Sequence, residues 1–400
     1  GVDIPGFIRY LREGDSVSAL EKIKKDNPFP AICGRICPAP CEGVCVFFEE
    51  GSPIAIRALE RYASDFGSKA MARMKTTVPS NGKSVAVVGS GPSAMAAAST
   101  LLMQGFKVVM FEAAGEPGGI LRYGIPEFRL PQDILASQFE ELKSLGLELN
   151  PNNFIGSMKP FEEVITTFHA GVFATGASLP GFTTKERWKL GGVYYAEELL
   201  MRLLMVSKEK VLYSTKPLFR GNTTLVVGSG YAVLDVARTA LRLGQQTSLV
   251  FGGLEEEMGV PEQEIKDALE EGLKILTPFE PLKILNDGQG FVQGVQCRRL
   301  EIVEGADSLS LAVVEEEPTI MEAQTVILAN SQKANSFLAK VVPHLKTKDD
   351  GSLWVDEKTF LTSLDKVFAV GSAVAGSMSV VQAFASGKAV ALKVSEHLIQ

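Results

Sequence analysis

The chain has 400 residues, 46% of them hydrophobic and 22% charged, which is an ordinary globular composition with room for two or three domains. A formal net charge of −7 argues against nucleic-acid binding, which needs a basic surface. No uninterrupted apolar run reaches the roughly 20 residues of a membrane-spanning helix. No signal peptide is visible, so we expect a cytoplasmic protein. Because the first residue is Gly1 rather than Met, an upstream segment, a leader included, stays open.

The N-terminal region combines helical patterns with closely spaced cysteines. Phe7–Leu11, Ala19–Ile23 and Ile54–Phe66 carry apolar residues at helical spacing. Four of the five cysteines lie between them, each separated from the next by three residues: Cys33, Cys37, Cys41 and Cys45. A disulfide scaffold does not suit a chain this long. The spacing therefore indicates metal or redox chemistry.

The residues between these cysteines favour a turn-rich loop that crowds all four thiolates together. Pro38, Pro40 and Gly43 are the turn formers. Cysteine thiolates hold iron–sulfur clusters, and four of them also make a structural zinc site. The spacing alone leaves iron–sulfur and zinc equally open.

A dinucleotide-binding pattern begins at Ser84. A predicted strand, Ser84–Val88, is followed by a glycine-rich turn and an alanine-rich helix to about Gln104, and Lys107–Glu112 reads as the next strand. In such a βαβ unit the first glycine makes the turn, the second admits a pyrophosphate, and the third small residue lets helix and strand pack closely. The acid that ends the second strand binds ribose hydroxyls. The corresponding residues are Gly89, Gly91, Ala94 and Glu112.

The pattern repeats about 140 residues later in a weaker form. Gly228 and Gly230 follow a predicted strand that begins near Thr223. The third small position is Val233, which we expect to hold the helix away from the strand or to narrow the phosphate seat, and Tyr231 is bulky for this loop. The second strand ends in Gly252-Gly253, which supplies neither an acid for a 2′-hydroxyl nor an arginine for a 2′-phosphate.

These patterns predict an α/β protein in which a helical iron–sulfur domain precedes two Rossmann-like dinucleotide-binding domains, the second inserted in the first. The expected boundaries are 1–80 for the helical domain, 81–195 with 325–400 for the first dinucleotide domain, and 196–324 for the second. An antiparallel hairpin is expected over Phe291–Val314 and a closing helix over Ser379–Ile399.

The segment from Asn27 to Cys45, Asn-Pro-Phe-Pro-Ala-Ile-Cys-Gly-Arg-Ile-Cys-Pro-Ala-Pro-Cys-Glu-Gly-Val-Cys, resembles the cluster domain of the glutamate synthase small subunit. It resembles still more closely the large subunit of NADH-dependent ferredoxin:NADP oxidoreductase and sulfide dehydrogenase. The resemblance covers essentially the whole chain and decides for iron–sulfur over zinc. It continues through Pro53–Tyr62, Leu121–Pro131, Gly192–Leu200, Ala240–Gly244, Val367–Gly371 and Gly387–Lys388.

This resemblance implies two 4Fe-4S clusters in the N-terminal domain, with part of the ligand set upstream of Gly1. It implies that Cys37 and Cys41 ligate one cluster and Cys45 the other, whereas Cys33 matches a position that is usually not a ligand. Glu60 matches a position that places a Gln or Glu side chain on a cluster, and a solvated helix residue is the open alternative.

The resemblance also implies FAD in the first dinucleotide domain and NADPH in the second. Four departures follow. The second loop lacks the family's small residues, and Gly252 and Gly253 stand where the family has paired arginines. The segment Ala329–Asn335 replaces the family's Ala-Ile-Gly segment, and Gly371-Ser372 replaces its Gly-Asp before the last helix. The first three make NAD(P) doubtful. The candidate cofactor-binding residues are Gly89, Gly91, Pro92, Ala94, Glu112, Gly119, Arg122, Gly176, Gly371 and Ser372, with Gly228 and Gly230 in the second domain.

We therefore expect an FAD- and 4Fe-4S-containing electron-transfer subunit that relays electrons between clusters and flavin. No acid–base or nucleophilic constellation stands out, which fits a redox relay. We expect other redox subunits as partners, either iron–sulfur or flavin proteins, and ferredoxin is one candidate. One alternative is an NAD(P)H-oxidising flavoenzyme of the glutamate synthase small subunit type. The other is a redox-silent scaffold that has lost both nucleotides.

Overall fold

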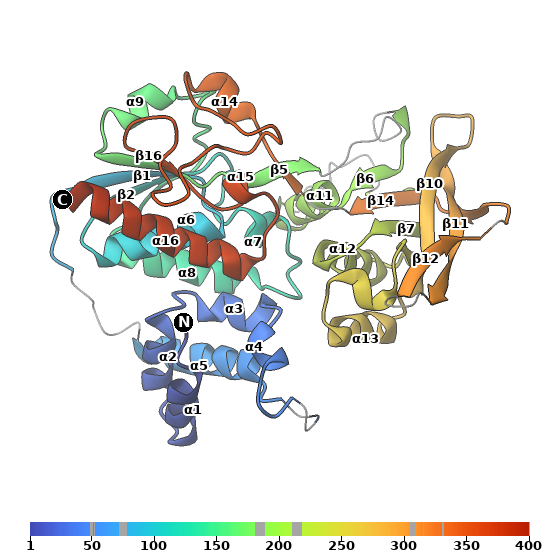
Figure 1. The fold of residues 1–400 in the computed structure, drawn as a ribbon, viewed down its shortest axis with the longest axis horizontal. Coiled ribbons are helices and arrows are strands. Elements are labelled where there is room, and N and C mark those ends of the chain that lie inside the picture. Colours follow the sequence, from blue (N-terminus) through green and yellow to red (C-terminus); the bar gives the residue numbers. More distant parts are fainter. Residues whose placement is uncertain are drawn as a thin grey trace. The chain divides into compact units, whose positions relative to one another are not determined.

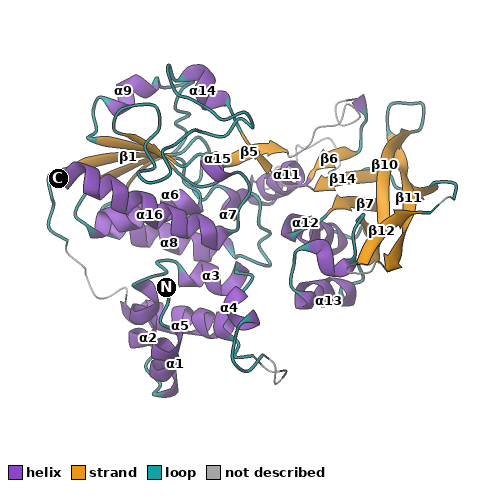
Figure 2. Ribbon diagram, in the orientation of Figure 1, coloured by secondary structure: helices purple, strands orange, loops and turns teal. Residues whose placement is uncertain are grey.

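The structure is a computed structural model that describes residues 1–48, 51, 53–71, 78–180, 189–209, 218–304, 309–314, 316–329 and 332–399. It forms two compact units, each with helices and strands (Figures 1 and 2). The first unit comprises Gly1–Arg122, Glu127–Leu179 and Gln332–Gln400, and the second comprises Tyr123–Pro126 and Pro180–Ser331. Within the described ranges, no helix has both the length and the apolar character needed to cross a bilayer.

The N-terminal part of the first unit is helical. Asp3 and Asp15 begin the first two helices, because their carboxylates accept the amide protons of Gly6 and Ser18 at 3.0 and 2.9 Å. The apolar faces of these helices meet the long fifth helix in a core that includes Phe7. The helices are α1 (Ile4–Arg12), α2 (Ser16–Lys24), α3 (Pro30–Ile36), α4 (Pro40–Gly43) and α5 (Ile56–Met71).

The cysteines do not share one turn-rich loop, and that expectation was wrong. Cys33 lies within α3, Cys37 follows the last residue of that helix, and Cys41 lies within α4. Pro30 and Pro40 each stand at the first position of a helix, where the missing amide proton costs nothing. The prolines therefore begin short helices here as well as making turns.

A five-stranded sheet forms the centre of the first unit, in the order β16-β4-β1-β2-β3 with all pairs parallel. Helices α6, α8 and α16 lie on one face and α9 and α14 on the other (Figure 1). The strands are β1 (Ser84–Val88), β2 (Lys107–Phe111), β3 (Glu148–Asn150), β4 (Ala170–Phe173) and β16 (Val367–Ala369). The helices are α6 (Pro92–Met103), α7 (Ile120–Tyr123), α8 (Gln132–Ser144), α9 (Phe161–Ile165), α14 (Phe337–Val341), α15 (Ser372–Ala375) and α16 (Val380–Ile399).

The closing helix α16 packs closely on α6, the helix that follows the first glycine-rich turn. A Cβ atom on Gly387 would lie 2.2 Å from the backbone oxygen of Ser93. Only glycine therefore allows the two helices this separation. Toward the N-terminal helices, the buried ring of Phe29 contacts Phe384 of α16, with 5.1 Å between ring centroids.

The second unit has a parallel sheet in the order β6-β14-β7-β8-β9, covered by helices on one face and by an antiparallel sheet on the other. Its strands are β6 (Val193–Tyr195), β7 (Thr223–Gly228), β8 (Gln246–Val250), β9 (Lys274–Leu276) and β14 (Thr325–Ala329), and the antiparallel strands are β10 (Phe279–Asn286), β11 (Val292–Glu304), β12 (Leu309–Val313) and β13 (Thr319–Glu322). Its helices are α11 (Ala196–Glu209), α12 (Tyr231–Arg242), η1 (Glu255–Met258) and α13 (Glu262–Glu270).

The boundary expected at residue 325 differs from the observed strand pairing. Strand β14, Thr325–Ala329, pairs with β7 of the second sheet, so it completes that sheet instead of returning to the first. The first unit resumes at Gln332, where β15 (Gln332–Ala334) pairs with β5 (Ala177–Pro180). An apolar strand carries no mark of which sheet it joins, and the division into three domains stays a prediction.

We predict that Gly387→Ala lowers the free energy of unfolding. In a helix interior this change ordinarily stabilises by about 0.8–1.0 kcal/mol. Here the added methyl group would meet the Ser93 carbonyl, and the overpacking would cost about 1–3 kcal/mol. Denaturant titration of the native chain and of Gly387→Ala measures the sign of the change in the free energy of unfolding.

The matched control is Gly43→Ala in α4, where a Cβ atom meets nothing within 4 Å and no loss of stability is expected. A stabilised Gly387→Ala protein would contradict the close packing of α16 on α6.

Candidate functional site

The first glycine-rich turn forms a cradle at the carboxyl end of β1. Gly89 has φ +106°, and a Cβ atom there would lie 2.4 Å from the carbonyl oxygen of Ala174, so this turn requires glycine. At Gly91 a Cβ atom would meet nothing within 4 Å. Gly91 therefore borders open space at the start of α6, the place that a pyrophosphate occupies in a dinucleotide fold. Pro92 is the first residue of the helix and Ala94 is fully buried.

Glu112 follows β2 and lies beside this turn. Its side chain is 9% exposed, and its carboxylate accepts the amide proton of Ala114 at 2.7 Å and the hydroxyl proton of Ser90. The Ser90 hydroxyl in turn accepts the amide proton of Gly118 at 2.8 Å. This network fixes the acid at the edge of the cradle. Ser90 was missed from the sequence, because the second position of a GxG motif places no demand on its side chain.

Gly119 and Arg122 shape the loop that passes over the cradle. A Cβ atom on Gly119 would lie 2.9 Å from the Cα atom of Gly91, so the loop approaches the turn backbone to backbone. Arg122 is 6% exposed and donates to the carbonyl of Pro117 at 2.6 Å and to Gln132 at 2.8 Å. It also pairs with Glu116 at 2.6 Å. In this arrangement Arg122 holds the loop in place.

Two further candidates end the neighbouring strands. Gly176 follows β4 with φ +73°, and a Cβ atom there would meet nothing within 4 Å. Gly371 follows β16, and its Cβ would lie 2.4 Å from the Ser93 hydroxyl oxygen, while Ser372 begins α15. Carboxyl ends of parallel strands share one edge of a sheet, which is where ligands bind in doubly wound folds. The fold therefore brings the first-domain candidates to a single edge.

The second glycine-rich turn differs from the first in the backbone of its second glycine, since Gly91 has φ −68°. Gly228 and Gly230 have φ +138° and +87°, and a Cβ atom on Gly230 would meet nothing within 4 Å. Val233 lies within α12 and is fully buried in the core between this helix and the sheet, and its expected effect on helix spacing or on the phosphate seat stays a prediction. The amide of Gly230 donates to the carbonyl of Met258 at 2.8 Å, a bond that the first turn does not have among the described contacts.

The carboxyl group of Glu60 acts electrostatically on three thiols of the cysteine segment, those of Cys33, Cys37 and Cys41. Burial raises the pKa of the Cys37 thiol, and the negative charges of Glu60 and Cys41 raise it further. Burial likewise raises the pKa of Cys41 and of Glu60. The amide of Ala39 donates to the Cys37 sulfur at 3.3 Å, the kind of bond that stabilises a thiolate. Such a set of thiolate and carboxylate donors fits an iron–sulfur cluster.

Cys33 differs from the other cysteines of the segment. It is 3% exposed, burial raises its pKa, and its sulfur lies 3.5 Å from the side-chain oxygen of Asn27. Asn27 also donates to Glu60 at 3.2 Å. Cys45 lies beyond α4, partly exposed. Across the described residues, no three His, Cys, Asp or Glu side chains converge to hold a single metal ion, so the ligand assignment stays a prediction.

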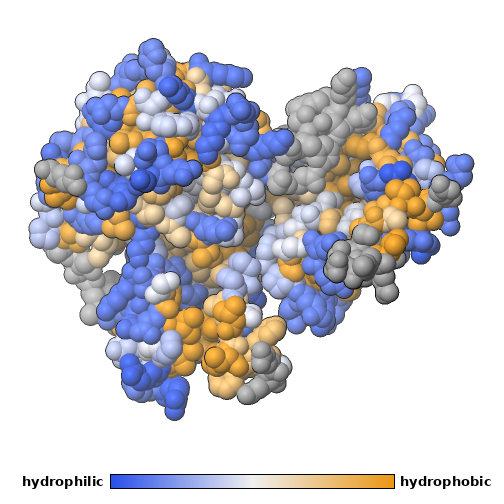
Figure 3. Space-filling model, in the orientation of Figure 1, coloured by the Kyte–Doolittle hydropathy of each residue, from blue (hydrophilic) through white to orange (hydrophobic). Residues whose placement is uncertain are grey.

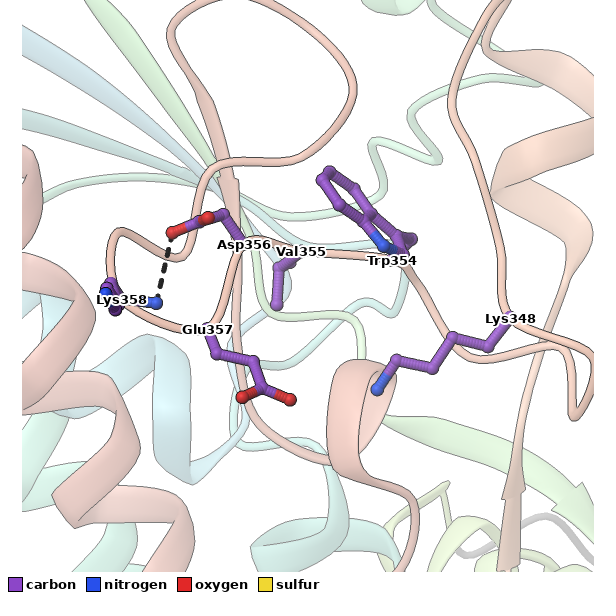
Figure 4. A pocket seen from close by; sticks show the side chains of 6 residues that line it. All are labelled: Lys348, Trp354, Val355, Asp356, Glu357 and Lys358. Atoms are coloured by element: carbon purple, nitrogen blue, oxygen red, sulfur yellow. Dashed lines mark hydrogen bonds between the residues drawn. The ribbon is translucent and has the colours of Figure 1, made fainter.

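A shallow pocket on the first unit lies away from the predicted residues (Figure 4). The carboxylate of Asp356 accepts the backbone amide proton of Lys358 at 3.0 Å there. Opposite charges mix in the pocket around one exposed indole, and no candidate site residue lines it. Its lining residues are Lys348, Trp354, Val355, Asp356, Glu357 and Lys358.

Two family models match the chain. The model described as dihydropyrimidine dehydrogenase domain II, 4Fe-4S cluster, matches residues 1–72. The model described as pyridine nucleotide-disulphide oxidoreductase matches residues 83–387. Together they span the cysteine segment and both glycine-rich turns.

Two relatives match along nearly the whole chain. The beta subunit of the NADP(+)-dependent formate dehydrogenase of Moorella thermoacetica is 31% identical over 100% of this chain, which spans 59% of that protein. The NADPH glutamate synthase small chain of Escherichia coli is 29% identical over 96% of this chain and 84% of its own length. The solved structure of Mycobacterium tuberculosis FprA in complex with NADPH shares the fold, with a TM-score of 0.62 and 19% identity over 80% of this chain and 84% of its own.

We predict that Gly91→Val yields folded protein without FAD. The backbone at Gly91 has φ −68°, which valine adopts without strain, and its side chain would fill the open space of the cradle. Flavin released by denaturation, counted per chain, measures the effect.

Met103→Val, at the exposed far end of α6, is the control and should retain flavin. Full flavin content in Gly91→Val would show that FAD does not bind at the first glycine-rich turn.

We predict that the cysteine segment binds iron, and that Cys37→Ala and Cys41→Ala lose iron while Cys33→Ala retains it. The family resemblance assigns the first two thiols as ligands, whereas Cys33 matches a position that is usually not a ligand and is buried within α3. Iron, acid-labile sulfide and zinc are to be measured on anaerobically purified protein.

Zinc in place of iron would refute the cluster assignment. Loss of iron in Cys33→Ala alone would show that the ligands were assigned to the wrong cysteines.

Proposed function

The chain belongs to the pyridine nucleotide-disulphide oxidoreductase family, and we propose that it is an FAD- and 4Fe-4S-containing electron-transfer subunit of a multi-subunit oxidoreductase. The observation that carries this proposal is the open cradle at Gly91 with the buried acid Glu112 beside it, in a chain that also carries a 4Fe-4S domain. A flavin converts between pairs of electrons and single electrons, and clusters carry single electrons.

The residues of the first unit would hold FAD through backbone and carboxylate contacts. The turn at Gly89 and Gly91 presents the start of α6 to the pyrophosphate, and Glu112 accepts hydrogen bonds from ribose hydroxyls. The start of α15, after Gly371, offers amides where the family's aspartate is Ser372. We assign binding and positioning of the flavin to this unit.

Cys37, Cys41 and Glu60 are the proposed cluster ligands of the N-terminal helices, with Cys45 assigned to a second cluster. The 4Fe-4S family model, which matches residues 1–72, supports this assignment. The N-terminal helices contact α16 through the ring of Phe29, which precedes α3 and lies against Phe384. They also contact it through Lys388 of α16, whose ammonium group lies 3.3 Å from the Asp26 carboxylate.

We propose that partner redox subunits exchange electrons near the cysteine segment. Support comes from the exposed apolar side chains that follow α4 beside Cys45, and from aromatic rings of α5, Tyr62 and Phe66, with 4.4 Å between centroids. Figure 3 shows apolar residues gathered over α4 and α5. The exposed residues that follow α4 are Val44, Val46, Phe47 and Phe48. We propose a cytoplasmic location.

The relay predicts that a one-electron donor reduces the flavin through the clusters. With a low-potential one-electron donor supplied anaerobically, flavin bleaching should be fast in the native chain. It should be equally fast in Cys33→Ala, because this substitution leaves the proposed ligands in place. Cys41→Ala should slow it strongly while flavin content stays the same. Stopped-flow absorbance follows both signals.

Equal rates in Cys41→Ala and the native chain would contradict the relay. Absence of both flavin and cluster absorption from native protein would support a redox-silent scaffold instead.

A further inference from the structure

The carboxyl end of β8 is the position that separates NADH from NADPH in a dinucleotide fold. Strand β8 pairs in parallel with β7, so its end lies at the same edge as Gly228 and Gly230. The side chain at this point contacts the adenosine ribose, and an acid there accepts the 2′-hydroxyl of NADH while an arginine accepts the 2′-phosphate of NADPH. The sequence offered only Gly252 and Gly253 at this place.

The structure places an acid here that the strand itself does not carry. Glu257, in η1, turns back toward the end of β8, and its Oε2 atom accepts the amide proton of Leu254 at 2.8 Å. A Cβ atom on Gly253 would lie 2.8 Å from that same oxygen. The carboxylate therefore rests against the glycine pair. It was missed from the sequence because a turn of 3-10 helix, not the strand, delivers it.

One cation near this end is already paired. Arg298 of β11 stands opposite Glu280 of β10, and its Nε donates to the Glu280 carboxylate at 3.1 Å. The Cα atom of Glu280 lies 3.7 Å from where a Cβ of Gly252 would stand. Arg298 therefore balances Glu280 beside the glycine pair, whereas the carboxylate that lies against Gly253 is that of Glu257.

We propose that the second unit binds NADH in preference to NADPH, with Glu257 as the specificity-determining residue. The inference rests on the proposed function only in taking the second unit as a dinucleotide-binding domain. A 2′-phosphate carries close to two negative charges, which a neighbouring carboxylate repels. A 2′-hydroxyl donates to the same carboxylate in a charge-assisted hydrogen bond.

Equilibrium titration of the full chain with NADH and with NADPH tests this. In the native chain, NADH should bind at least about tenfold more tightly, the ratio that one charged hydrogen bond supplies. Glu257→Gln keeps an oxygen for the Leu254 amide and removes the charge, so the ratio should fall by about tenfold. Glu256→Gln removes the same charge from the neighbouring exposed residue and is the matched control, with the ratio retained.

Gly252→Arg is the second, independent variant. A Cβ at Gly252 has ordinary contacts of 3.7 Å, whereas one at Gly253 would lie 2.6 Å from the Phe251 ring, so position 252 is the one that accepts a side chain. The new guanidinium should tighten NADPH binding about tenfold or more and leave NADH binding nearly unchanged.

Three results would overturn the proposal. These are equal or tighter binding of NADPH by the native chain, an unchanged ratio in Glu257→Gln, and binding of neither nucleotide. Loss of NADPH binding in Arg298→Gln would likewise overturn it, by showing that this arginine holds the phosphate. Flavin and iron content are measured on the same samples, so the electron-relay proposal stands or falls separately.

Discussion

Close approach of one backbone to another at the carboxyl end of β1 is the constraint on which the candidate flavin site depends. Gly89 approaches the Ala174 carbonyl, Gly119 approaches Gly91, and Gly387 approaches Ser93, each at a distance that no Cβ atom allows. These contacts bring the strand ends, the loop over the cradle and the closing helix to one place. The space beside Gly91 stays open. The candidate flavin site is therefore formed mainly by closely packed backbone, and Glu112 is its chief side chain.

The second unit has a glycine-rich turn at the corresponding place in a different electrostatic setting. Around the first turn the acid is buried and bonded to Ser90 and the amide of Ala114. Around the second turn the acid lies on a short helix after the strand, and the amide of Gly230 binds the carbonyl of Met258. The acid beside the turn is therefore buried in the first unit and exposed in the second. The chain spans 59% of the length of the formate dehydrogenase relative, whose name specifies NADP(+).

The βαβ units were predictable from the sequence because strand, glycine turn and helix are adjacent and each has its own local pattern. The strand Ser84–Val88 was predicted to the residue. Contacts between distant segments were not predictable, such as the approach of Gly387 to Ser93. The contact of Glu257 with the glycine pair is local, but it depends on the short helix η1, which the sequence pattern did not indicate. Strand β14 joins the second sheet, a choice that its apolar residues do not encode.

The cysteine segment shows the same limit in another form. Its spacing pointed to metal chemistry, and the 4Fe-4S family model matches it. The placement of Cys33 inside α3, apart from Cys37 and Cys41, depends on where the two prolines begin helices, which spacing alone does not decide.

The electron relay requires one chain to hold a flavin and iron–sulfur clusters that exchange electrons. An anaerobic reductive titration of the purified chain, followed by visible absorption and electron paramagnetic resonance, measures this exchange. We expect the sample to accept more reducing equivalents than its flavin alone, with cluster and flavin signals changing in the same titration. A sample that accepts only the equivalents of its flavin, or none, would refute the relay.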